Sequence, residues 1–150
     1  MSGSSILVGT DFSDGAMSAL MEARALAMRL GAAVRVLHAF AHPDWSDHPA
    51  VGRWLARARL KLDDVIAVAG TPWIELTRHG LETDALMLCI GSHGTGGFQP
   101  LLPGSTTTRI LARTTLPVLV VRPDRGSYSS MEPMQRNTNS RITQQKTENV

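Results

Sequence analysis

Five short apolar segments, separated by stretches with helical periodicity, constrain this chain more than any other feature. The stronger segments are almost continuously apolar and do not alternate apolar with polar residues. Strands have this pattern when helices cover both faces of their sheet, because every side chain then points into a core. The five expected strands are Ile6–Gly9, Val34–Phe40, Val65–Ala69, Ala85–Ile90 and Val118–Val121.

The helical stretches fall between consecutive strands. The first follows Ser13, a good N-cap, and ends at Gly31, which suits a left-handed C-terminal position. Its apolar face repeats every three or four positions and consists of Ala16, Leu20, Ala23, Ala27 and Leu30. Further helices are expected at about Ala50–Lys61, from Pro72 to about Gly80, and from about Ser105 to Arg113. This alternation predicts an α/β fold with a parallel sheet and right-handed crossovers.

The chain has 150 residues, which fits one domain. We expect the folded domain over residues 1–123, since all the periodic segments lie there. Residues 124–150 are polar, rich in Ser, Thr, Asn and Gln, and without periodicity. They offer few apolar groups to offset the entropy of ordering, so a disordered C-terminal tail is expected.

The composition argues against several classes of protein. The formal net charge is +2, and no run of Lys and Arg could follow a phosphate backbone, so nucleic acid is not an expected partner. No apolar run approaches the roughly 20 residues that span a bilayer, and the N-terminus lacks the features of a signal peptide, so a cytoplasmic protein without membrane contact is expected. Cys89, the one cysteine, lies within an apolar run. We interpret it as a small buried side chain rather than a reactive thiol.

The chemistry is expected in residues 91–106, which follow the fourth strand and lead into the last helix. The glycines of this segment, which allow tight turns and a close approach to a ligand, are Gly91, Gly94, Gly96 and Gly97. Gly104-Ser105-Thr106 then places backbone N–H groups and hydroxyls at a helix N-terminus, which attracts anions such as phosphate. We interpret the segment as a phosphate cradle. The alternative is a flexible connection that needs glycine only for its turns.

Several motifs, in the right order over about residues 4–123, resemble the universal stress protein family. The family's nucleotide signature is a glycine, two residues, a second glycine, nine residues and then Gly-Ser or Gly-Thr; Gly91, Gly94 and Gly104-Ser105 match it. Gly9-Thr10-Asp11-Phe12-Ser13 resembles the end of the family's first strand, with Gly9 where many members have proline. His38-Ala39 stands where the second strand of the family often ends in His-Val.

The resemblance implies a five-stranded sheet in the order 3-2-1-4-5, with helices on both faces and ATP between strands 1 and 4. ADP and AMP are alternative ligands, and Mg²⁺ is an accompanying ion. Asp11 would contact the ribose or adenosine end, the backbone of Ala39 would meet adenine, and Gly104, Ser105 and Thr106 would hold the phosphates. The complete predicted nucleotide-binding set is Gly9, Asp11, Ala39, Gly91, Ser92, His93, Gly94, Thr95, Gly96, Gly97, Gly104, Ser105 and Thr106.

The resemblance also implies a homodimer, because family members often pair their last strands. The residues expected at this interface are Val118, Leu119, Val120 and Val121. The same strand would otherwise be an apolar edge, and such edges are usually covered.

Other interpretations of single residues have less support. Asp11 as a phosphoacceptor of the response-regulator type would need a lysine after the last strand, where this chain has Val121-Arg122-Pro123. Residues 42–48 contain metal-ligand types, but their irregular spacing favours a surface loop. No nucleophile stands with a base, so we predict no catalytic residue and no metal ligand. The expected function is a nucleotide-binding stress-response regulator that acts through ligand-dependent interactions; a slow ATP-hydrolysing enzyme and a nucleotide-free dimerisation module remain alternatives.

Overall fold

A parallel five-stranded sheet organises the chain, as a computed structural model shows for residues 3–92 and 104–122. The strands are β1 (Ser5–Gly9), β2 (Ala33–Phe40), β3 (Val65–Ala69), β4 (Met87–Gly91) and β5 (Val118–Val121). The helices are α1 (Asp14–Leu30), α2 (Pro49–Ala58), α3 (Pro72–Glu82) and α4 (Ser105–Arg113), with short 3-10 turns η1 (Trp45–Asp47) and η2 (Leu62–Asp64). The strand order is β3-β2-β1-β4-β5, which confirms the predicted fold and order.

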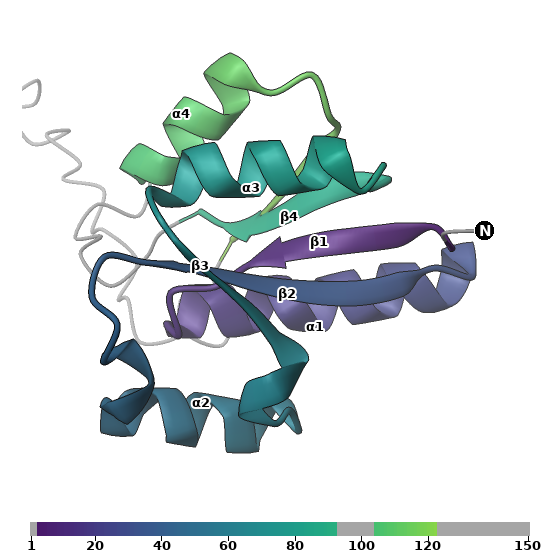
Figure 1. The fold of residues 1–150 in the computed structure, drawn as a ribbon. Helices are drawn as coiled ribbons and strands as arrows, with labels where there is room; N and C mark the ends of the chain where they lie inside the picture. Colours follow the sequence, from purple (N-terminus) through teal and green to yellow (C-terminus); the bar gives the residue numbers. More distant parts are fainter. Residues whose placement is uncertain (1–2, 93–103, 123–150) are drawn as a thin grey trace, which may run out of the picture.

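Helices cover both faces of the sheet (Figure 1): α1 and α2 lie on one face, and α3 and α4 on the other. The central strand β1 therefore contributes to two cores. Ile6 and Val8 point into the core beneath α1 and α2, while Leu7 points into the core beneath α3 and α4. All three side chains are at most 1% exposed, which explains the continuous apolar character of this strand.

Helix α1 has the ends that its sequence predicts. The Ser13 side chain accepts a hydrogen bond from the backbone N–H of Ala16, and Gly31 closes the helix with φ +62° and its N–H on the carbonyl of Ala27. The face of α1 toward the sheet is lined mainly by alanines, and such small side chains allow a helix to approach the strands closely.

Cys89 of β4 lies in this close contact. Its side chain is 0% exposed, and Sγ donates a 3.3 Å hydrogen bond to the carbonyl of Ala19 in α1. Burial raises the pKa of the Cys89 thiol to about 12, and the negative charge of Glu22 adds to the shift. Cys89 is thus the small buried side chain that the sequence indicates, and its raised pKa disfavours the reactive thiolate.

The third helix ends two residues beyond the predicted stop near Gly80. α3 continues through Gly80 to Glu82. A Cβ on Gly80 would lie 2.8 Å from Leu88 Cδ2 and 2.8 Å from Leu116 Cδ1, so this glycine allows the helix to pack closely on the sheet rather than ending it. The second helix, in contrast, ends earlier than predicted, at Ala58, because Arg59 has the left-handed φ of +55°.

No helix in the described ranges, 3–92 and 104–122, is long and apolar enough to cross a membrane. The predicted tail, residues 124–150, lies outside these ranges. Strand β5 pairs with β4 alone among the described strands and forms one edge of the sheet. The homodimer expected through Val118–Val121 therefore stays a prediction.

Candidate functional site

A cavity of about 380 Å³ opens at the carboxyl ends of the central strands β1 and β4. The chain leaves β1 toward β2, whereas β4 lies on the other side of β1, so the strand order reverses at this position. Ligands of open parallel sheets bind at such a reversal, because the two connecting loops diverge and leave a crevice. The volume lies in the range of small-molecule pockets.

Most of the described members of the predicted nucleotide-binding set line this cavity. They come from four separate stretches of chain and are Gly9, Asp11, Ala39, Gly91, Gly104, Ser105 and Thr106. Ser92 is buried next to the cavity, where its backbone N–H bonds Val121 and its carbonyl accepts a 2.7 Å hydrogen bond from the N–H of Gly104. His93, Gly94, Thr95, Gly96 and Gly97 lie outside the described residues.

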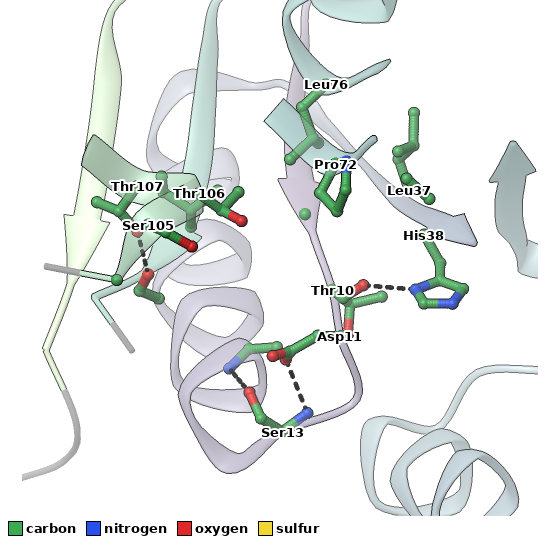
Figure 2. A pocket seen from close by; sticks show the side chains of 16 residues that line it. Thr10, Asp11, Ser13, Leu37, His38, Pro72, Leu76, Ser105, Thr106 and Thr107 are labelled. Atoms are coloured by element: carbon green, nitrogen blue, oxygen red, sulfur yellow. Dashed lines mark hydrogen bonds between the residues drawn. The ribbon is translucent and has the colours of Figure 1, made fainter. Parts of the chain in front are cut away.

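One side of the cavity is polar and is formed by the first turn of α4. Gly104 is the N-cap and has no side chain that could cap the helix, in contrast to Ser13 of α1. The hydroxyls of Ser105 and Thr106 are directed toward the open space (Figure 2), whereas the Thr107 hydroxyl donates a 3.0 Å bond to the carbonyl of Gly91. The first N–H groups of a helix have no intrahelical partner, so this turn offers amides, hydroxyls and the positive end of a helix dipole.

The opposite wall is the loop of residues 10–13 between β1 and α1. Asp11 Oδ1 accepts a 3.0 Å hydrogen bond from the backbone N–H of Ser13, and Thr10 Oγ1 accepts a 2.9 Å bond from the N–H of Phe12. Figure 2 shows Thr10, Asp11 and Ser13 across the cavity from Ser105 and Thr106. The site therefore places a carboxylate on one wall and an anion-attracting helix end on the other.

The remaining wall is apolar. It consists of Leu37 and Ala39 of β2, Pro72 and Leu76 of α3, and Ile90 of β4. Pro72 occupies the first helical position of α3, where its missing N–H would have no partner anyway. This helix end consequently presents hydrocarbon to the cavity, unlike that of α4.

Two glycines of the predicted set have structural neighbours that their motif does not indicate. A Cβ on Gly91 would lie 2.8 Å from the backbone carbonyl of Gly15, and a Cβ on Gly9 would lie 2.6 Å from Leu76 Cδ1. At both positions the missing side chain makes room for a helix packed on the strand end. Both residues still line the cavity through their backbone.

Sequence reasoning missed nine lining residues, namely Thr10, Ser13, Ala16, Leu37, His38, Pro72, Leu76, Ile90 and Thr107. Thr10 directly follows the expected first strand and Thr107 follows the predicted site residue Thr106, which is a usable signal. Leu76 has no such signal, because it lies one turn inside α3 and reaches the cavity only through the packing of that helix. Among the described residues, no group of three or more His, Cys, Asp or Glu side chains could hold a metal ion.

The family model that matches this chain is the universal stress protein family, over residues 4–68 and 55–122. The chain belongs to the universal stress protein family. It is 31% identical over 133 residues to a universal stress protein of Thermus aquaticus, covering 78% of this chain and 97% of that protein. A universal stress protein of Mycolicibacterium smegmatis is also 31% identical over 133 residues, covering 79% of this chain and 45% of that protein, so the chain spans less than half of this relative.

Solved structures of universal stress proteins share the fold. A universal stress protein in complex with cAMP is 22% identical, with a TM-score of 0.63, over 83% of this chain and 100% of that one. The Archaeoglobus fulgidus universal stress protein in complex with dAMP is 18% identical, with a TM-score of 0.60, over 81% of this chain and 100% of that one.

Proposed function

We propose that this universal stress protein binds an adenine nucleotide in the cavity between β1 and β4. The observation that carries the proposal is the division of the cavity into an apolar wall, a carboxylate wall and the α4 N-terminus without a side-chain cap. A nucleotide has the same three parts: a planar base, a ribose with hydroxyl donors, and anionic phosphates. The cAMP and dAMP complexes of two family members support the adenine assignment.

The roles follow from the position of each wall. The base would lie at the apolar wall, where the backbone of Ala39 offers hydrogen-bonding groups beside Leu37 and Leu76. The Asp11 carboxylate would accept hydrogen bonds from ribose hydroxyls. Phosphate oxygens would accept from the amides and hydroxyls of Ser105 and Thr106.

ATP is the ligand that we propose, with ADP and AMP as alternatives and Mg²⁺ as an accompanying ion. The protein would then act as a stress-response regulator whose interactions depend on the bound nucleotide, and its place in the cytoplasm remains a prediction. Within the described residues, the only carboxylate that lines the cavity is that of Asp11, whose Oδ1 accepts a hydrogen bond from the amide of Ser13. We therefore assign no catalytic residue.

The test is calorimetric titration with ATP, ADP and AMP, each with and without Mg²⁺. Binding free energies of about −5 to −8 kcal/mol, which correspond to submillimolar to micromolar affinity, would support the proposal. Adenosine serves as the matched control, because it tests the base and ribose walls without phosphate. Titrations that do not saturate below several millimolar for any of the nucleotides would overturn it.

A further inference from the structure

The loop between β1 and α1 has an unusual backbone at Phe12. Its φ is +61°, in the left-handed region that an aromatic residue rarely adopts. Such a conformation persists only where the surroundings hold it, and it concentrates at ligand-binding positions. The neighbouring Asp11 and Thr10 line the cavity, so whatever holds Phe12 also fixes the direction of these two residues.

An aromatic cluster holds the Phe12 side chain. Its ring centroid lies 4.6 Å from that of His38, 5.4 Å from that of Trp54 in an edge arrangement, and 5.7 Å from that of Trp45 in a stacked one. Trp54 is 2% exposed, and its Nε1 donates a 3.0 Å hydrogen bond to the carbonyl of Ser13. The aromatic side chains that contact Phe12 thus come from β2, η1 and α2, which follow the loop later in the chain.

His38 alone in this cluster combines ring packing with a hydrogen bond at the start of the loop. Its Nδ1 lies 2.8 Å from the carbonyl oxygen of Thr10 (Figure 2). A carbonyl oxygen only accepts, so Nδ1 must carry the hydrogen. The Thr10 N–H is bonded to the carbonyl of Leu37 at 2.9 Å, so strand β2 holds both backbone groups of Thr10.

The bond to Thr10 has a direct geometric consequence for Asp11. The carbonyl of Thr10 and the N–H of Asp11 belong to one planar peptide unit. Fixing the carbonyl fixes that plane, and the Cα of Asp11 lies in it. The Asp11 carboxylate is then oriented by its own bond to the Ser13 amide, 3.0 Å long.

We propose that His38, whose side chain lines the cavity, is a positioning residue for the nucleoside end and acts mainly through its hydrogen bond to the Thr10 carbonyl. The proposal rests on the proposed function, because it assigns Asp11 to the ribose. The ring contacts Phe12, and the Nδ1–H orients the peptide that leads to Asp11. A displaced Asp11 would weaken nucleoside contacts while leaving the phosphate side unchanged.

Two substitutions separate the bond from the packing. His38→Phe keeps an aromatic ring but loses the donor, whereas His38→Asn loses the ring but keeps an N–H donor at the δ position. The experiment measures AMP affinity by calorimetry for both variants and for Phe40→Leu. Phe40 packs on Trp45 with centroids 6.0 Å apart, yet it does not line the cavity, so it is the matched control for the cluster.

His38→Phe should weaken AMP binding about three- to tenfold, the effect of one ordinary hydrogen bond. His38→Asn should recover most of that loss, and Phe40→Leu should bind like the unaltered protein. Unchanged affinity in His38→Phe would overturn the proposal, as would an Asn variant as weak as the Phe variant.

A second measurement needs neither a variant nor a nucleotide. Nitrogen-15 NMR of the His38 ring in the unaltered protein should show hydrogen on Nδ1, and a neutral ring with hydrogen on Nε2 alone would overturn the proposal. Absence of AMP binding by the unaltered protein would instead contradict the proposed function. The NMR result then still tests the hydrogen bond from His38 Nδ1 to Thr10.

Discussion

At the apolar wall of the cavity, the Leu76 side chain occupies the space that a Cβ on Gly9 would need. A Cβ on Gly9 would lie 2.6 Å from Leu76 Cδ1 and 3.3 Å from Ile90 Cγ2, closer than packed carbon atoms approach one another. Leu76 is 3% exposed, so its side chain has little room to move away. The residue at the end of β1 is therefore constrained by Leu76, which lies 67 positions later in the chain.

Gly9→Ala should lower the free energy of unfolding by about 1–3 kcal/mol, the usual cost of overpacking a core. The Gly9→Ala/Leu76→Ala double variant should lose less than the sum of the two single variants, because the added methyl group fills part of the space that Leu76 leaves. Urea denaturation of the four proteins measures this coupling. Gly52→Ala in α2 is the control: a Cβ there meets nothing within 4 Å and alanine favours the helix, so this substitution should not lower stability. If the losses in free energy of unfolding at positions 9 and 76 were additive, they would contradict the steric conflict between a Cβ at position 9 and Leu76.

Ser105→Ala should weaken ATP binding by about tenfold or more, because a hydrogen bond to a charged group contributes roughly 1.5–3 kcal/mol. Adenosine affinity should change little, since the hydroxyl faces the proposed phosphate side. Thr108→Ala is the matched control: Thr108 lies in the same helix, and its hydroxyl bonds the carbonyl of Gly104 at 3.1 Å. Calorimetry with both ligands checks the prediction. Equal weakening of adenosine and ATP would show that Ser105 does not face phosphate.

Asp11→Ala should weaken adenosine and ATP by a similar factor, about tenfold, because it removes a charged acceptor from the nucleoside end. Asp11→Asn provides the comparison. The amide oxygen of the asparagine can still accept a hydrogen bond from the Ser13 N–H, so this variant should keep the loop conformation while losing the negative charge. An Asp11→Ala variant that loses affinity for ATP but not for adenosine would place this carboxylate elsewhere than at the ribose.

The buried thiol of Cys89 should make stability depend on pH in alkaline solution. The unfolded chain releases the thiol proton above its ordinary pKa of 9.0, whereas the folded protein keeps it up to about 12. The unfolded state therefore binds fewer protons in this window, and the free energy of unfolding falls as pH rises from about 9 to 12. By pH 10 the loss should be about 1.4 kcal/mol.

Urea denaturation of the unaltered protein and of Cys89→Ala at pH 8 and pH 10 isolates this effect from other titrating groups. From pH 8 to pH 10, the difference in free energy of unfolding between the two proteins should shrink by about 1.4 kcal/mol, because alanine has no proton to lose. Curves that shift in parallel would indicate that the thiol does not contribute.

The homodimer through β5 should appear as a concentration-dependent mass in sedimentation. Val118, Leu119 and Val120 are half-buried at the edge of the sheet, and an open apolar edge favours pairing with a second copy. A monomer mass at every concentration would contradict the dimer.

The strands could be predicted from their local apolar pattern, and their order from the family resemblance of motifs spread over about residues 4–123. The same motifs point to seven residues that line the cavity. The packing role of Gly80 could not be predicted, since a glycine there has the usual signature of a helix stop, and only its neighbours Leu88 and Leu116 show another reason for it. Gly91 is a similar case, because its close neighbour is the backbone of Gly15 in the first turn of α1. The hydrogen bond between His38 and Thr10 could not be predicted either, because 28 positions separate the two residues.

The cavity walls come from five stretches of chain that approach one another only when all the central strands are in place. A small molecule held between them would act as a removable cross-link between the two halves of the sheet. Any partly unfolded form would lose at least one wall, and with it the affinity. Ligand at a hundredfold excess over its Kd would then add about 2.7 kcal/mol to the stability of the complete fold alone. The lifetime of the folded chain in the cell would consequently follow the supply of that ligand.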